Sequence, residues 1–248
     1  MLFIRSLLLL VALLSPAFGQ NGSQIAPSAK DAVQALKLYL EGVSKSGGRP
    51  DYTKPPASEL IQRVFDLEQL TALPPSKASD LPWLLEWFNA ANQTTKLMMY
   101  FDAKPGPDLD QPAVLRNLTE YQDQYASAMN FLIRIMAREG PALFQFMDQL
   151  TPEQRTPIRE AGVQKARGGG AGLISGSIGF VADERVSPAN ARLMTAAMRD
   201  TQDFWATFML PDDRLQITSL LARAANMVKD DEARKYLAAF AATLTAAK

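Results

Sequence analysis

The sequence contains no cysteine and no histidine. Without cysteine the chain forms no disulfide, so a hydrophobic core must stabilise it, and 248 residues with a 47% hydrophobic composition are enough for a large core. Without either residue type, the common zinc ligand sets, Ser-His-Asp triads and Cys-His pairs are excluded. We therefore expect no metal site and no cofactor, and the sequence favours a protein that is not an enzyme.

An excess of charge of either sign is also missing. Lysine and arginine together number 26, and aspartate and glutamate also number 26. A balanced chain produces no strong field that would attract nucleic acid. We therefore expect no nucleic-acid partner.

The N-terminus has the pattern of a secretory signal peptide. Arg5 provides the basic region, an apolar run follows at 6–14, and Ala17 and Gly19 place small residues at positions −3 and −1 of a cleavage site. The sequence therefore predicts a signal peptide at 1–19 and a periplasmic or secreted protein. The apolar run is shorter than the about 20 residues that span a bilayer, so we expect no transmembrane helix in the mature chain. Export without disulfides favours a bacterial source.

Apolar residues recur at intervals of three and four along most of the chain, which is the spacing of an amphipathic helix. The run Ala32, Val33 and Leu36 is one example. Sustained alternation of apolar and polar residues, which would indicate strands, is missing from the sequence. The pattern predicts an all-α fold, a single globular bundle of roughly eight to ten helices at 28–248 that follows a flexible leader at 20–27.

Prolines and capping residues set the expected helix ends. A long helix is expected from about Pro112 to Glu139, and Pro141 is expected to begin a short one. Thr151-Pro152-Glu153-Gln154 matches a capping box with proline in the first turn, which predicts a helix start. The five residues Leu150–Gln154 also resemble the L-T-x-x-Q pattern of the small periplasmic helical stress-response chaperones, and we take no function from that resemblance.

Acidic clusters are the next candidates for chemistry. The clusters are Asp183-Glu184, Asp212-Asp213 and Asp230-Asp231-Glu232. Each lies at an expected helix start, where negative charge complements the helix dipole. We interpret them as helix-start residues, and a catalytic carboxylate pair or a calcium site is the alternative.

The most unusual segment is Gly168–Ala182, which contains six glycines and no charged residue. It lacks the lysine of a Walker loop and the third glycine of a dinucleotide-binding loop, so the sequence does not favour a phosphate site. The segment is also too short to cross a membrane as a helix, because fifteen residues rise only about 22 Å.

On a helical wheel the small residues of this segment fall on one side, and the bulky residues fall on the other side with Gly170. The glycines of the small face are Gly168, Gly172, Gly176 and Gly179. We predict a helix whose small face packs closely on a neighbouring helix, so that alanine at Gly176 destabilises the fold more than alanine at Gly170. The alternative is a loop or hinge that admits a ligand.

Three functional hypotheses follow from the sequence. The leading one is an exported, non-enzymatic, all-helical protein that interacts with an unidentified protein or envelope component. The second is a binder of a small apolar ligand, held beside the glycine-rich helix at 168–182 against methionine and aromatic side chains. The third is an enzyme that uses only carboxylate and lysine or tyrosine chemistry.

Overall fold

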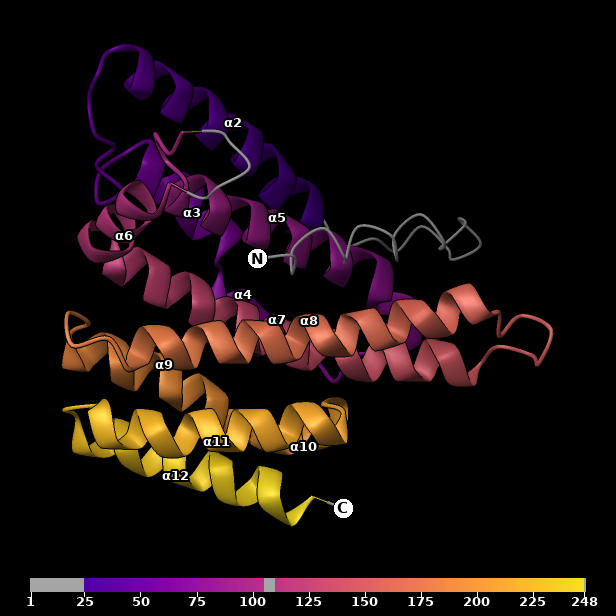
Figure 1. The fold of residues 1–248 in the computed structure, drawn as a ribbon. Helices are drawn as coiled ribbons and strands as arrows, with labels where there is room; N and C mark the ends of the chain where they lie inside the picture. Colours follow the sequence, from indigo (N-terminus) through magenta and orange to yellow (C-terminus); the bar gives the residue numbers. More distant parts are fainter. Residues whose placement is uncertain (1–24, 105–109, 248) are drawn as a thin grey trace.

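The computed structural model describes residues 25–104 and 110–247, and this part of the chain consists of helices and loops without any strand. The helices form one globular arrangement, so the predicted all-α fold is confirmed (Figure 1). The predicted signal peptide at 1–19, with Ala17 and Gly19, lies outside the described residues. None of the helices in the two described ranges is long and apolar enough to cross a membrane.

The N-terminal helices pack around α2 and α5. They are α2 (Ile25–Lys45), α3 (Ala57–Val64), α4 (Leu67–Ala72), the 3₁₀ turn η1 (Ala78–Asp80) and α5 (Leu81–Met99). The apolar stripe of α2, which includes Val33 and Leu36, is buried where α2 packs on α3 and α5. Ala26 is only 1% exposed in the first turn of α2, so the helix begins inside the predicted leader at 20–27. The leader prediction is therefore wrong for residues 25–27.

The next two helices are α6 (Gln111–Glu120) and α7 (Gln122–Asp148). The predicted boundary at Pro141 is wrong, because Pro141 lies inside α7 and the chain breaks instead at Tyr121. Proline removes one backbone hydrogen bond from a helix. The ring of Pro141 is exposed while Gly140 and Ala142 on either side are buried, so packing holds the helix together through this position.

The C-terminal helices complete the fold. They are α8 (Pro157–Val181), α9 (Pro188–Asp200), α10 (Gln202–Phe208), α11 (Pro211–Met227) and α12 (Asp231–Ala246). The helix start predicted at Thr151 is wrong. The Thr151 N–H donates to the Gln154 side chain at 3.0 Å, as in a capping box, but these residues form a turn and Thr156 caps α8 instead.

In the assembled fold, α7 and α8 cross the middle of the molecule, with α2, α3 and α5 on one side and α11 and α12 on the other (Figure 1). α7 packs on α5 and α9, and α8 packs on α11, α9 and α7. The largest fully buried side chains include Trp87, Phe131, Trp205 and Phe208. α7 therefore lies at the centre of a single core, and α8 lies along it.

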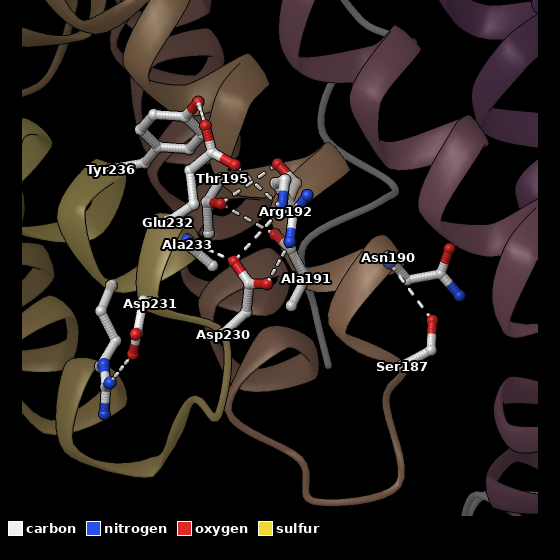
Figure 2. Close-up of polar contacts among 11 residues, drawn as sticks. Ser187, Asn190, Ala191, Arg192, Thr195, Asp230, Asp231, Glu232, Ala233 and Tyr236 are labelled. Atoms are coloured by element: carbon white, nitrogen blue, oxygen red, sulfur yellow. Dashed lines mark hydrogen bonds and ion pairs between the residues drawn. The ribbon is translucent and has the colours of Figure 1, made fainter.

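The acidic cluster at 230–232 is a structural joint between α9 and α12 (Figure 2). Arg192 of α9 forms ion pairs with Asp230 and, at 3.1 Å, with Glu232. Asp230 also accepts a hydrogen bond from the Ala233 N–H at 2.8 Å, which caps α12. The hydrogen bonds from Arg192 and Ala233 lower the pKa of Asp230 to about 2. The helix-start interpretation is confirmed for this cluster.

The other two acidic clusters differ from each other. Asp212 and Asp213 lie in the first turn of α11, as expected for helix-start residues. Asp183 and Glu184 lie in the turn after α8, where Asp183 pairs with Arg185, so the helix-start interpretation is wrong there. Within the two described ranges, no group of three acidic side chains is placed to hold a metal ion.

Candidate ligand-binding cavity

The predicted helix in the glycine-rich segment is confirmed, because α8 continues to Val181. The predicted close packing of its small face is wrong at three positions. A Cβ atom at Gly168, Gly176 or Gly179 would meet no neighbouring atom within 4 Å, and Gly176 and Gly179 are exposed. Gly172, the fourth predicted position, is half-buried at the wall of a cavity.

Gly170 of α8 packs closely against its neighbours, although the helical wheel placed it among bulky residues. Its added Cβ would lie 2.9 Å from Cζ3 of Trp205 and 3.0 Å from Cε1 of Phe208. Both rings come from α10, and the Arg167 guanidinium holds that helix in place by donating to the Phe208 carbonyl oxygen. Gly170 therefore provides the flat surface on which the two rings pack. This surface is on a different side of α8 from the small face that was predicted to pack closely.

A cavity of about 180 Å³, here called the inner cavity, lies between α5, α7 and α8. Its apolar lining includes Phe88, Met99, Met129, Leu132, Met136 and Leu173. Most small-molecule sites are concave and apolar, with a few polar groups that orient the ligand. An apolar cavity of about 150 Å³ is enough to bind benzene. The inner cavity therefore has the size and the lining of a site for a small apolar group.

Glycines of α8 form one wall of the inner cavity. Gly169, Gly172 and Gly176 recur at intervals of three and four, so they share one side of the helix, and all three line the cavity. Their missing side chains leave the backbone of α8 facing the space. At Gly176 no neighbouring atom would obstruct a side chain, so close packing does not account for glycine at this position.

The helices around the inner cavity run in a fixed register. Rings of Trp87 and Phe131, 5.1 Å apart, place the first half of α5 beside the middle of α7. Rings of Tyr125 and Phe180, 4.7 Å apart, place the end of α8 beside the start of α7. Along α7 the lining extends from Tyr125 to Met136, which is about 16 Å at 1.5 Å per residue.

This register gives the inner cavity a polar end and an apolar end. Lys96 and Asn92 of α5 and Tyr125 of α7 line it, and none of their side chains has a hydrogen bond or ion pair with the described residues. Burial lowers the pKa of Lys96. Burial, together with the nearby Tyr100 hydroxyl, raises the pKa of Tyr125 to about 12. Three polar side chains without a hydrogen bond or ion pair to the described residues thus belong to the lining of the cavity.

Two further hollows adjoin the inner cavity. One, of about 210 Å³, shares Tyr125 and Gly176 with it and extends towards α6. The other is a surface groove of about 580 Å³ between α2 and α5, and it shares Lys96 with the inner cavity. Lys96 therefore lies at the boundary between the apolar interior and the groove.

The buried carboxylate of Glu139 does not belong to this site. Glu139 is 2% exposed, its Oε2 atom has no hydrogen-bond partner, and burial raises its pKa to about 8. The residues that line the inner cavity include no carboxylate, and Asp183 in the adjoining hollow is paired with Arg185. The inner cavity and the hollow that extends towards α6 therefore give no support to catalysis by a carboxylate pair.

Sequence reasoning missed Lys96 and Tyr125 as site residues. The available signal was the spacing of Phe88, Asn92 and Lys96, which puts an amide and an ammonium on a stripe that otherwise faces the core. Polar residues on such a stripe do not reveal whether a cavity lies beside them.

Comparisons with protein-family models, curated proteins and solved structures found no match.

Proposed function

We propose that the protein is a non-enzymatic binder of a small, mainly apolar ligand held between α5, α7 and α8. The observation that carries this proposal is the inner cavity, with methionine and aromatic side chains on two helices and a glycine wall on the third. Export to the periplasm or the exterior, predicted from the residues at 1–19, remains part of the proposal, as does an envelope component as the source of the ligand.

The energetic cost of this arrangement supports a role for the space. Each glycine in the helix costs about 1 kcal/mol relative to alanine. At Gly176 a side chain would fit without obstruction and would remove this cost. A ligand that fills the space beside α8 therefore gives the glycine at this position a use.

The surface gives less support to the partner-protein hypothesis. In the described part of the chain, the exposed large hydrophobic side chains are Leu38, Leu115, Ile158, Leu193, Leu215 and Met227. They are spread over five helices, and isolated apolar residues are normal on protein surfaces. Association with a protein therefore stays a prediction from the sequence, and ligand binding is the function that the geometry favours.

Binding of 1-octanol tests the proposal, because this neutral ligand combines an eight-carbon chain with one hydroxyl. We expect saturable binding by calorimetry and a rise in Tm that follows the bound fraction. Gly176→Leu should weaken binding at least ten-fold by filling the space. Gly168→Leu is the matched control, because Gly168 also has free space around its Cβ but lines none of the three hollows. Absence of binding, or equal loss in both variants, would contradict the proposal.

A further inference from the structure

We propose that the ligand carries an anionic group of the carboxylate type, as a medium-chain fatty acid does, and that Lys96 binds this group at the polar end of the inner cavity. This inference rests on the proposed function and specifies its ligand. Its basis is the position of Lys96, which lines both the apolar inner cavity and the surface groove.

Lys96 is the one charged residue among the described residues that line the inner cavity. Two carboxylates, those of Glu41 and Asp102, line the adjoining groove, and neither forms an ion pair with Lys96. Glu41 lies 4.0 Å from the Lys37 ammonium, and Asp102 accepts a hydrogen bond from the Ser44 hydroxyl at 2.6 Å. The half-buried ammonium of Lys96 therefore has no ion-pair partner among the described residues.

Two residues with neutral donors accompany Lys96. Asn92 lies one helical turn before Lys96, and Tyr125 lines the cavity from α7. A carboxylate accepts several hydrogen bonds, and charge-assisted ones are the strongest. An ammonium, an amide and a hydroxyl without partners match such a group better than they match a neutral alcohol, which satisfies fewer donors.

The apolar part of the ligand extends away from these donors. Met129, Leu132 and Met136 line the cavity along α7 with increasing distance from Tyr125. If benzene, with six carbons, fills about 150 Å³, then about 180 Å³ holds roughly seven carbon atoms. Octanoate, with a seven-carbon tail beyond its carboxylate, is therefore the appropriate probe.

The test compares octanoate with 1-octanol by calorimetry on the full chain, at a pH where octanoate is ionised. We expect wild type to bind octanoate at least ten-fold more tightly than 1-octanol. Lys96→Met keeps the apolar stem and removes the charge, so it should weaken octanoate binding at least ten-fold and 1-octanol binding by a much smaller factor. Lys96→Arg keeps the positive charge, so it should retain most of the octanoate affinity of wild type. Lys37→Met is the matched control, because Lys37 lines the groove but not the inner cavity.

The outcomes separate the two proposals. If wild type binds 1-octanol and octanoate equally, or if Lys96→Met and Lys37→Met weaken octanoate binding equally, the carboxylate assignment is overturned while the apolar site stands. If wild type binds neither compound, the proposed function fails together with its ligand. A circular-dichroism melting curve for each variant establishes that the altered affinity belongs to a folded protein.

Discussion

α8 places glycine in two contrasting surroundings. At Gly170 the rings of Trp205 and Phe208 leave no room for a methyl group, whereas at Gly176 no neighbouring atom lies within 4 Å of an added Cβ. The first position lets two rings of α10 pack against the backbone of α8, and the second leaves a cavity open. Glycines of a single helix can thus either allow tight packing or leave a space open. The neighbouring helices determine which of the two occurs at each glycine.

Ionisable side chains show the same contrast. Glu139, beside the closely packed Gly140, is fully buried without a partner for Oε2, and burial raises its pKa to about 8. Lys96, at the inner cavity, is half-buried beside the groove, and burial lowers its pKa. The closely packed surroundings of Glu139 favour an uncharged carboxyl group. The inner cavity, in contrast, has the ammonium of Lys96 at its boundary with the groove.

Glu139→Gln should produce the largest effect. The pKa of Glu139 is raised on folding, so its stabilising contribution is complete below about pH 4.5 and is lost as the pH rises towards 8. Wild type should therefore lose stability between pH 5 and 8, at up to about 1.4 kcal/mol per pH unit. Carboxyl groups with a lowered pKa, such as Asp230, titrate below this window. Urea unfolding at several pH values should show a flatter profile for Glu139→Gln, and an unchanged slope would contradict the account.

Gly140→Ala should be the next most severe change. An added Cβ would lie 2.6 Å from Cζ of Phe204 and 3.3 Å from Cδ2 of Phe208, and the Phe204 and Phe208 rings stack on each other at 4.8 Å. Overpacking of this kind typically costs about 1–3 kcal/mol. Gly42→Ala in α2, where an added Cβ meets nothing within 4 Å, is the control and should be neutral or stabilising in the same denaturation experiment. Equal stability of the two variants would mean that Phe204 moves aside freely.

Gly170→Ala should lower the stability by about 1 kcal/mol, because a gain in helix propensity partly offsets the clash with Trp205 and Phe208. The Met136 methyl group, at 3.0 Å, is flexible and can yield, but the tryptophan ring is rigid. Thermal melting measures the change. A higher Tm than that of wild type would show that α10 is not held tightly against α8.

Gly176→Ala should have the smallest effect and the opposite sign. Its Cβ enters free space, so the gain in helix propensity and the restricted unfolded chain should stabilise the protein by up to about 1 kcal/mol. This reverses the order of Gly176 and Gly170 that the helical wheel predicted. The same melting experiment decides between the two orders, since a lower Tm for Gly176→Ala than for Gly170→Ala would restore the original prediction.

The all-α class followed from the sequence because helical periodicity and capping signals are local. The acidic cluster at 230–232 is an example, because it was expected at a helix start and Asp230 caps α12. Local signals failed where tertiary contacts decide. Pro141 remained inside a helix because its neighbours are buried, and the capping box at Thr151 closed only a turn.

The candidate site could be predicted only in part. The glycine-rich helix was predicted, since composition and spacing are visible in one segment, and its association with methionine and aromatic residues was part of the second functional hypothesis. The packed side of α8 was assigned wrongly, because it depends on α10, whose rings reach Gly170 from more than 30 residues away in the sequence. The proposed role of Lys96 likewise depends on the way α5, α7 and α8 meet at the inner cavity.

A crystal structure of the protein under xenon pressure tests the central claim most directly, because xenon enters apolar cavities without needing polar contacts. The account predicts a xenon atom in the inner cavity, among Met129, Leu132, Met136 and Gly172, and none beside Gly170. Side chains of α5 and α7 that close over the glycine wall and leave no xenon there would contradict it.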